Sequence, residues 1–301
     1  MSTTAQDFNR VALVGRVDDA RSVDVMLVLA SHLAARGRHV LMTATEGQAF
    51  PADTAELWPE AEIASHSDLV IAVGGDGTML RAARLAAVAE VPVLGVNRGR
   101  LGFLADIGPE QMLDRVDDAL AGRCLPERRM LLQASLRQGD VDCAAIALND
   151  VLVAKRESGR MLDVRTWVDG AFVNTHGGDG FIVSTSTGST AYALSCGGPI
   201  VHPSMAALVL VPICPHTLSD RPVVVGADCV VELEIAGSLE TRAQVVCDGV
   251  VLCDLEPGVR LRVSRAPVTV TLLHPPGHDY YRILRSKLHW GRGPRDSHPR
   301  D

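Results

Sequence analysis

The chain has 301 residues, of which 47% are hydrophobic and 22% charged, and its formal net charge is −7. A chain of this length and apolar content can bury a full core in one large or two medium-sized domains. The negative charge argues against a broad surface for nucleic acid or an anionic membrane. Aromatic residues make up only 4% of the chain, which is too few for a platform on which bases stack. A phosphate ligand fits this composition, because glycine amides and a few arginines can form a phosphate site locally.

The cysteines and the N-terminus predict a cytoplasmic protein. The seven cysteines are odd in number and include no Cys-x-x-Cys pair, which favours reduced thiols that pack in the interior. The N-terminus lacks a basic start followed by an apolar run, so no signal peptide is expected. The longest apolar runs have the length of strands and are too short for a membrane span.

The first hundred residues alternate between apolar strands and helices. Continuous apolar strands that are separated by helices predict a parallel sheet with both faces covered. The expected strands are residues 10–15, 39–44, 68–75 and 91–97, and the expected helices are residues 23–37, 52–58, 78–90 and 109–122.

After residue 122 the pattern becomes β-rich, with short β-branched segments between Asp-Gly, Gly and Pro turns. The sequence therefore predicts an α/β domain with a parallel sheet (1–106), to which the tail (274–301) returns, and a β-rich, sandwich-like domain (107–273). The segment 280–291 is expected to form a helix or a strand, and the polar end after it to be disordered. The predicted strands are residues 130–137, 145–154, 163–170, 171–175, 181–185, 208–213, 229–237, 241–249, 259–266 and 268–273.

The quadruplet Gly74-Gly75-Asp76-Gly77 stands where an apolar strand ends and a helix begins. This is the carboxyl end of a parallel strand, where α/β sheets bind ligands. Glycines let the backbone approach a ligand and expose N–H groups, and a helix N-terminus favours an anion. An acidic residue in such a turn makes Asp76 a candidate base, hydroxyl-orienting group or magnesium contact in phosphoryl transfer. An ordinary Asp-Gly turn is the alternative.

The same four residue types recur at 177–180, in front of a Ser/Thr-rich stretch that begins at Ser184. Free N–H groups and hydroxyls in such a loop suit contacts with ribose and pyrophosphate. Ser189 or Thr190 is expected to cap a short helix, and Tyr192 offers a ring on which a base can stack. A plain loop is the alternative interpretation.

Asn149 and Asp150 are adjacent in an otherwise apolar strand. Neighbouring side chains of a strand point to opposite faces, so this pair predicts a bulge or a strand end, with a buried turn as the alternative. Arg98 and Arg100 lie among glycines at the end of another strand. They are interpreted either as phosphate contacts or as solvated side chains.

Several familiar motifs are missing from the sequence. No G-x-x-x-x-G-K-[ST] occurs, and no G-x-G-x-x-G follows the first strand, which argues against a P-loop and against a dehydrogenase-type dinucleotide site. The histidines and cysteines show no zinc spacing, and no G-x-S-x-G nucleophile elbow is present.

Taken together, these motifs resemble those of the NAD kinases. Gly-Gly-Asp-Gly alone also marks diacylglycerol and sphingosine kinases and occurs in phosphofructokinases, but the Ser/Thr-rich block and "GRLGFL" separate this chain from them. The resemblance runs from about residue 68 to the tail. It rests on "GGDGTMLRAAR", "PVLGVNRGRLGFLAD", "LNDV", "DGFIVSTSTGSTAYALSCGGPIVHP", "PICPHTLSDRPVVV", "CDG" and "YYRILRSKLHWG", in the order that the family has.

The resemblance implies a kinase that transfers the γ-phosphoryl group of ATP or polyphosphate to the 2′-hydroxyl of the adenosine ribose of NAD, giving NADP. A divalent metal, Mg or Mn, is implied as cofactor. The implied active site lies in the cleft between the two domains. The resemblance further suggests a homodimer or homotetramer, whereas the cytoplasmic location and the lack of a nucleic-acid or membrane partner are expected from composition and charge.

The resemblance also implies roles for individual residues. Asp76 is expected to be the catalytic carboxylate near the reacting hydroxyl. The donor phosphates are expected at Gly74, Gly75, Gly77, Thr78 and Arg81. The NAD pocket is expected to comprise Phe103 by the adenine, Asn149 and Asp150 at the ribose hydroxyls, Asp179 near the nicotinamide, Thr190, Ala191, Tyr192 and Ser195, with Asp248 reaching across a subunit boundary.

Three positions depart from the pattern of this family. Asp150 stands where Glu is usual, Ser186 stands where Pro is usual and favours a looser loop, and Gly177 leaves no cation before the second Gly-Asp-Gly. One alternative is a lipid kinase of the same superfamily, which the missing apolar entrance and the NAD-pocket blocks disfavour. The other is a non-catalytic NAD-binding paralogue, for which the departures at positions 150 and 186 are the only support.

Overall fold

The computed structural model describes residues 8–43, 55–99, 102–156, 161–237 and 241–290. The chain forms two compact units, each of which draws on several stretches of sequence. Unit 1 comprises Met1–Met79, Leu94–Glu127 and Leu273–Asp301, and unit 2 comprises Leu80–Val93 and Arg128–Leu272. Among the helices of the described ranges, none is both long and apolar enough to cross a membrane.

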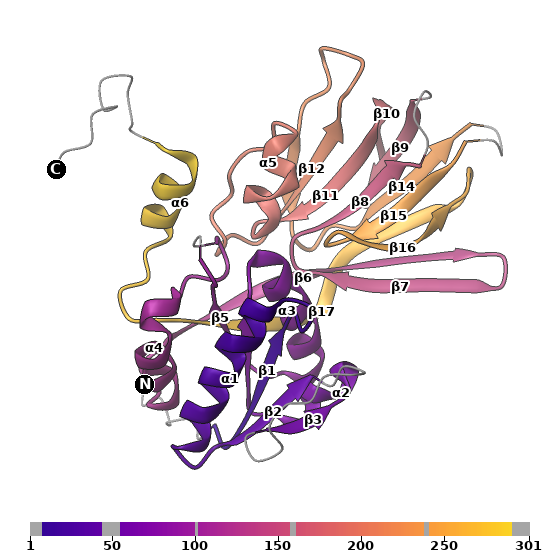
Figure 1. The fold of residues 1–301 in the computed structure, drawn as a ribbon. Helices are drawn as coiled ribbons and strands as arrows, with labels where there is room; N and C mark the ends of the chain where they lie inside the picture. The colour runs from indigo at the N-terminus through magenta and orange to yellow at the C-terminus, as the bar shows by residue number, and fades with distance from the viewer. Residues whose placement is uncertain (1–7, 44–54, 100–101, 157–160, 238–240, 291–301) are drawn as a thin grey trace. The chain divides into compact units, whose positions relative to one another are not determined.

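The sheet of unit 1 has the strand order β3-β2-β1-β4-β5 (Figure 1). Strand β1 pairs in parallel with β2 and β4, and β2 with β3. The strands are β1 (Arg10–Gly15), β2 (His39–Thr43), β3 (Glu56–Trp58), β4 (Leu69–Val73) and β5 (Val93–Val96). The helices of unit 1 are α1 (Ala20–Ala34), α2 (Glu60–Ile63), α4 (Met112–Leu120) and α6 (Tyr280–Leu288), with 3₁₀ turns η1 (Ala64–His66) and η2 (Pro109–Gln111). Helix α3 (Asp76–Ala89) begins in unit 1, and its residues from Leu80 onward belong to unit 2.

The core of unit 1 explains why these segments fold as they do. Strands β1 and β4 are almost wholly buried, and their side chains pack with those of α1 and α4 in one hydrophobic cluster. Helix α1 contributes Met26, Leu29 and Leu33, which recur at helical spacing and are fully buried. The prediction of an N-terminal α/β domain with a parallel sheet is therefore confirmed.

One element of unit 1 was predicted wrongly. The segment 52–58 was expected to be helical, but its described part forms β3, which extends the sheet beside Leu41–Thr43 in parallel register. Pairing with an exposed sheet edge outweighs the helix preference of so short a segment. The segment 280–291, for which helix and strand were both open, forms α6, and the residues after 290 lie outside the described ranges.

Unit 2 contains two antiparallel sheets around one hydrophobic core. One has the strand order β13-β12-β11-β8-β15-β16. The other includes β10-β9-β14-β17, with β6 pairing β17 and β7. The strands are β6 (Leu125–Gln138), β7 (Val141–Ala147), β8 (Asp150–Lys155), β9 (Leu162–Val168), β10 (Ala171–Gly178), β11 (Gly180–Thr185), β12 (Ala207–Ile213), β13 (Val223–Gly226), β14 (Val231–Ala236), β15 (Ala243–Cys247), β16 (Val250–Leu255) and β17 (Arg260–His274).

The β-rich second domain is confirmed, with four differences in detail. The expected strand 145–154 is broken between β7 and β8, and the two expected strands 259–266 and 268–273 form the single strand β17. Strands β13 and β16 were not predicted. Both lie at the edges of their sheet, where one neighbour is missing and the burial pattern is weak.

The second Gly-Gly-Asp-Gly lies where β10 ends and β11 begins. A Cβ atom on Gly180 would lie 2.2 Å from the carbonyl oxygen of Val153 on β8, and one on Gly178 would lie 2.5 Å from that of Ile213. These two glycines therefore let neighbouring backbones approach. Gly177 differs, because a Cβ there would meet only the side-chain oxygen of Asp163, at 3.3 Å.

We therefore expect Gly180→Ala to lower the free energy of unfolding by about 1–3 kcal/mol, because the added methyl group must push β11 away from β8. The matched control is Gly177→Ala, for which we expect a change below about 0.5 kcal/mol. Urea unfolding followed by circular dichroism measures both values. Equal stability of the two variants would contradict this account of the second motif.

Candidate functional site

The first Gly-Gly-Asp-Gly forms the turn from β4 into α3. The carbonyl oxygen of Gly75 accepts hydrogen bonds from the N–H groups of Thr78 and Met79, at 3.0 and 3.1 Å, so the helix starts immediately after this residue. A Cβ on Gly74 would lie 2.2 Å from the hydroxyl oxygen of Thr78. At Gly75 and Gly77, in contrast, a Cβ would meet no protein atom within 4 Å. The turn thus presents open backbone at the N-terminus of a 14-residue helix, which is an arrangement that suits phosphate.

The carboxylate of Asp76 accepts three backbone hydrogen bonds from one loop of unit 1. Oδ2 accepts from the N–H of Phe103 at 2.9 Å, and Oδ1 accepts from Leu104 at 3.1 Å and Ala105 at 3.3 Å. Gly102 completes the contact, because a Cβ there would overlap Oδ1 at 1.9 Å. Asp76 therefore fixes the loop that carries Phe103, and Oδ2 keeps a lone pair for a further partner.

The other donor-phosphate candidates lie further along α3. The side chain of Thr78 is buried against Gly74, and Arg81, one turn later, is half-buried. Of the two arginines after β5, Arg98 forms an ion pair with Asp19, which ties it to the start of α1. Arg100 lies outside the described residues.

Asn149 and Asp150 lie where the chain passes from β7 to β8, as the sequence predicted for a strand end. Their loop is held by Asp248, from the tight turn between β15 and β16. Its carboxylate accepts from the N–H groups of Leu148 and Asn149, both at 2.8 Å, and of Asp150, at 3.2 Å. Asp248 has a φ of 48° and the following Gly249 a φ of 80°, as a two-residue hairpin turn requires.

The side chain of Asp248 is fully buried in this arrangement. Besides the three N–H groups, its Oδ2 lies 3.6 Å from the guanidinium of Arg84 on α3. The sequence-based expectation was that Asp248 reaches across a subunit boundary to NAD. That expectation stays a prediction, and within its own chain Asp248 positions the loop of Asn149.

Asp150 is the ionisable group that this arrangement perturbs most clearly. Burial and the neighbouring Asp248 carboxylate raise the pKa of Asp150 to about 7. Among the described residues, none donates a hydrogen bond to the Asp150 carboxylate. A buried carboxyl group without a donor is costly when ionised, so this group is well suited to accept hydrogen bonds from a ligand.

The Ser/Thr-rich loop packs directly on the segment of Asn149. The Asn149 carbonyl accepts from the N–H of Thr185 at 2.8 Å, and the Thr185 hydroxyl donates to the carbonyl of Leu148 at 2.6 Å. Gly188 is required at its position, because a Cβ there would lie 2.2 Å from the Asn149 carbonyl oxygen. The loop and the Asn149 segment therefore form one rigid wall of unit 2.

Two details of this loop differ from expectation. Neither Ser189 nor Thr190 caps the short turns η3 (Gly188–Thr190) and α5 (Tyr192–Ser195): the Thr185 hydroxyl accepts from the first N–H of η3 at 3.0 Å, and the hydroxyl of Ser189 accepts from the N–H of Val201 at 3.0 Å. Ser186 does not loosen the loop. Its buried hydroxyl donates to the carbonyl of Met205 at 2.5 Å, which fixes the segment without proline.

The remaining NAD-pocket candidates of unit 2 gather beside this wall. Tyr192 is 46% exposed, and burial, Cys196, Cys214 and the charge of Asp179 raise its pKa. Burial, Cys214 and the charge of Asp150 likewise raise the pKa of Cys196. These couplings place Asp150, Tyr192 and Asp179 within electrostatic reach of one group of side chains. Thr190 and Ala191, which precede α5, are half-buried, and Ser195 at the end of α5 is exposed.

Two charged residues of the site were not found by the sequence analysis. Lys155 of β8 places Nζ 2.5 Å from Oδ1 of Asp179, which supplies a cation that position 177 lacks. Arg84 contacts the Asp248 carboxylate and the carbonyl of Cys247. Neither residue belongs to a motif. Arg84 lies two helical turns after Asp76, and this spacing is the one feature of the sequence that could have indicated it as a candidate.

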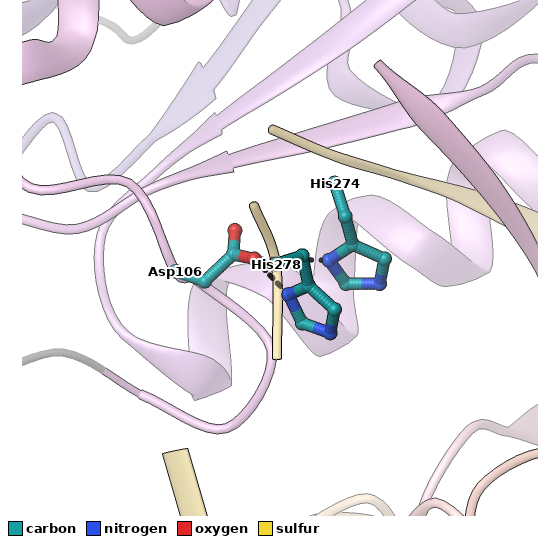
Figure 2. Close-up of side chains that lie close together, drawn as sticks. All are labelled: Asp106, His274 and His278. Atoms are coloured by element: carbon teal, nitrogen blue, oxygen red, sulfur yellow. Dashed lines mark hydrogen bonds and ion pairs between the residues drawn. The ribbon is translucent and has the colours of Figure 1, made fainter. Parts of the chain in front are cut away.

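Figure 2 shows the one group among the described residues that could hold a metal ion. Oδ2 of Asp106 lies 3.0 Å from Nδ1 of His274 and 2.7 Å from Nδ1 of His278. Burial raises the pKa of Asp106, but hydrogen bonds from both imidazoles outweigh it and lower the pKa overall. Nε2 of His274 lies 3.2 Å from Glu127. These are hydrogen-bond distances, and the cluster anchors the segment before α6 to the rest of unit 1.

Comparisons with known proteins give a consistent result. The model of the ATP-NAD kinase N-terminal domain matches residues 11–124, and that of the C-terminal domain matches residues 148–274. An NAD kinase of Nitrosococcus oceani is 42% identical over 289 residues, which cover 96% of this chain and 99% of that protein. An NAD kinase of Thiobacillus denitrificans is 43% identical over 286 residues, which cover 95% of this chain and 98% of that protein.

Solved structures show the same similarity. An NAD kinase of Archaeoglobus fulgidus in complex with ATP is 28% identical, with a TM-score of 0.72 over 93% of this chain and 98% of that chain. A yeast NADH kinase complexed with NADH has a TM-score of 0.87 over 95% of this chain and 89% of that chain. At 22% identity, the yeast structure supports the fold alone.

The raised pKa of Asp150 predicts a pH-dependent stability. Between about pH 4 and about pH 7 the native protein binds the Asp150 proton and the unfolded chain does not, so stability falls as pH rises through this window. Across this window we expect the free energy of unfolding of the parent protein to fall by on the order of 2–4 kcal/mol, and we expect Asp150→Asn to remove this fall. Urea unfolding at pH 5, 6, 7 and 8 measures this contribution.

The exposed Asp142 provides the control for this prediction, and Asp142→Asn should leave the pH dependence of the parent protein intact. Asp248→Asn is expected to destabilise at every pH, because it replaces one of the two acceptor oxygens with an NH₂ group that faces backbone N–H donors. A stability profile of Asp150→Asn that runs parallel to that of the parent protein would contradict the assignment.

Proposed function

The chain belongs to the NAD kinase family and is a phosphotransferase, and we propose that it transfers the γ-phosphoryl group of ATP to the 2′-hydroxyl of the adenosine ribose of NAD, giving NADP. Polyphosphate is a further candidate donor. The observation that carries the proposal is the placement of Asp76, a carboxylate that is fixed at the N-terminus of α3 between two glycines with open space above them. The lipid-kinase alternative is not favoured, because the relatives at about 42% identity are NAD kinases over nearly their full length.

In this proposal the turn of α3 binds the donor phosphates. The exposed N–H groups around Gly75 and Gly77 and the helix dipole stabilise their negative charge, with Thr78 and Arg81 nearby on the helix. Phosphoryl transfer proceeds through a loose transition state, so alignment and charge neutralisation contribute more than a strong base. The loop that Asp76 holds through three N–H groups is part of that alignment.

Asp76 is proposed to orient the 2′-hydroxyl with the free lone pair of Oδ2. The 2′-oxygen forms a bond to the γ-phosphorus as the bond from that phosphorus to the bridging oxygen of ATP breaks. The hydroxyl proton passes to Asp76 late in the step, because a carboxylate cannot remove it beforehand. ADP leaves as the second product.

NAD is proposed to bind along the wall of unit 2. The adenosine ribose hydroxyls would donate to Asn149 and to the Asp150 carboxylate, which among the described residues has no donor of its own. Such bonds favour the ionised form and would lower the pKa of Asp150. Tyr192 offers its exposed ring, Ser195 lies on the same turn α5, and Thr190 and Ala191 directly precede this turn. Asp179, with Lys155, is proposed at the nicotinamide end, and Phe103 by the adenine.

The proposed metal cofactor is Mg²⁺ or Mn²⁺ that arrives bound to ATP. Mg²⁺ prefers oxygen ligands and binds through phosphates with only one or two carboxylates. The residues fit an ion that the phosphates hold, because the candidate metal group among the described residues contains two histidines and the free lone pair of Asp76 Oδ2 is assigned to the 2′-hydroxyl. When bound, the metal would neutralise phosphate charge. A cytoplasmic homo-oligomer remains the expected form of the protein.

Asp76→Asn tests the proposed chemistry. The amide cannot take the proton, and its NH₂ group would face the loop N–H donors, so we expect turnover to fall by about 10²–10⁴-fold. NAD affinity should change by less than about threefold, because Asn149 and Asp150 are untouched. The assay follows NADP formation from ATP and NAD with magnesium, alongside NAD titration calorimetry.

The matched control is Gly102→Ala, which displaces the Asp76 carboxylate with its charge intact. If position matters, this variant should also lose turnover, but its pH profile should keep the limb of a carboxylate that Asp76→Asn lacks. Near-normal turnover of Asp76→Asn would refute the role. Phosphorylation of sphingosine in place of NAD would refute the acceptor.

A further inference from the structure

Unit 2 also contains a cavity that is lined by basic residues and lies apart from the residues assigned to NAD. It is a cavity of about 280 Å³ formed by the start of β6, the segment before β12 and one part of β17. Its lining comprises Arg128, Arg129, Met130, Pro203, Ser204, Met205, Ala206, Arg265 and Thr269.

Three arginines line this cavity, and among the described residues that line it none is acidic. Arg128 donates to the Thr269 hydroxyl at 3.0 Å, which leaves further donors of its guanidinium for a ligand. Arg265 lies 3.3 Å from Asp228, but that carboxylate is 91% exposed, so the pair is weak and easily exchanged. Arg129 is 4% exposed and so brings a buried positive charge to the wall.

The cavity is linked to the Ser/Thr-rich loop by two hydrogen bonds. Arg129 donates to the hydroxyl of Thr187 at 3.2 Å. On the other wall, the carbonyl of Met205 accepts from the Ser186 hydroxyl at 2.5 Å. Both loop residues directly precede Gly188, which packs on the Asn149 carbonyl. A change in the cavity therefore reaches the proposed NAD wall through two short contacts.

We propose that this cavity binds a small phosphorylated anion, and that its occupancy tightens NAD binding through the Ser186–Thr187 segment. The anion-binding half stands on the cavity alone. The coupling half rests on the proposed function.

The chemistry of the lining specifies the class of ligand. Three arginines match the oxygens of a diphosphate or of two phosphate groups, to which guanidinium forms charge-assisted bidentate hydrogen bonds. The volume lies near the lower limit of small-molecule sites, which favours a ligand smaller than a dinucleotide. Met130, Pro203 and Met205 add an apolar side that a small organic phosphate could cover.

The direction of the coupling follows from the charges. Without a ligand, positive charges outnumber negative ones among the lining residues, and the repulsion between them, lessened at Arg265 by the exposed Asp228, opposes a tight arrangement of the walls. A bound anion relieves this repulsion and holds the segment of Ser204 and Met205 against β6. Ordering Met205 also orders its hydrogen-bond partner Ser186. NAD then binds to a loop that is already ordered, so its binding costs less conformational entropy.

The first experiment titrates pyrophosphate into the full-length protein by calorimetry, without NAD, ATP or metal and at low salt. Ribose 5-phosphate is the second probe, since it distinguishes an organic phosphate from an inorganic one. We expect saturable binding that weakens by about tenfold or more in Arg128→Gln and in Arg265→Gln. Arg262→Gln is the matched control, because Arg262 is an exposed arginine of the same strand and does not line the cavity.

The second experiment measures the affinity for NAD with and without saturating pyrophosphate. We expect the dissociation constant to fall by about fivefold in the parent protein and in Arg262→Gln, and to stay unchanged in Arg265→Gln. Ser186→Ala should bind pyrophosphate normally but transmit less of the effect, because it loses the bond to Met205.

Absence of pyrophosphate and ribose 5-phosphate binding would overturn the anion site, as would binding that Arg128→Gln and Arg265→Gln leave unaltered. Sedimentation of the same variants supplies another decisive outcome. If they change the subunit number and no anion binds, the arginines serve an interface and the proposal fails. Normal anion binding with no effect on NAD affinity would overturn the coupling. Absence of NAD binding altogether would instead refute the proposed function.

Discussion

One interaction occurs once in each unit and fixes a loop that carries candidate site residues, namely a single carboxylate that accepts three consecutive backbone N–H groups. Asp76 holds residues 103–105 in this way, and Asp248 holds residues 148–150. Neither loop could pair these N–H groups within a helix or sheet, and unpaired buried donors are costly. A carboxylate has about four lone-pair positions and therefore satisfies three donors from one point. Both loops depend on this acceptor for their shape.

The second of these interactions has an electrostatic consequence. By holding the Asn149 loop, Asp248 places a buried negative charge beside Asp150, and two buried carboxylates resist joint ionisation. Arg84 offsets part of that charge from 3.6 Å. The free protein thus keeps at Asp150 an acceptor that is poorly solvated and short of donors. A ligand with adjacent hydroxyl groups relieves this shortage, which favours a ribose over an apolar headgroup at the same place.

The sequence was informative where local pattern decides the structure. The apolar strands of unit 1, the turn at Asp76 and the strand end at Asp150 followed from periodicity and glycine placement. It failed where a partner far along the chain decides. Residues 56–58 form a strand because a sheet edge was available, and β17 stays continuous through Pro267. The bonds from Asp248 to a loop about a hundred residues earlier have no local signature, since "CDG" reads as an ordinary hairpin turn.

The two copies of Gly-Gly-Asp-Gly show why identical residues can serve different purposes. In the first copy, Gly74 makes room for Thr78, while Gly75 and Gly77 face no protein atom, so the space beside them is left for a ligand. In the second copy, neighbouring carbonyl oxygens occupy the space beside the glycines on both sides of Asp179, so these glycines serve strand packing. The first aspartate is bound by backbone N–H groups, and the second by a lysine side chain. The motif therefore specifies a backbone without side chains, and the surrounding atoms decide whether a ligand or the protein occupies that space.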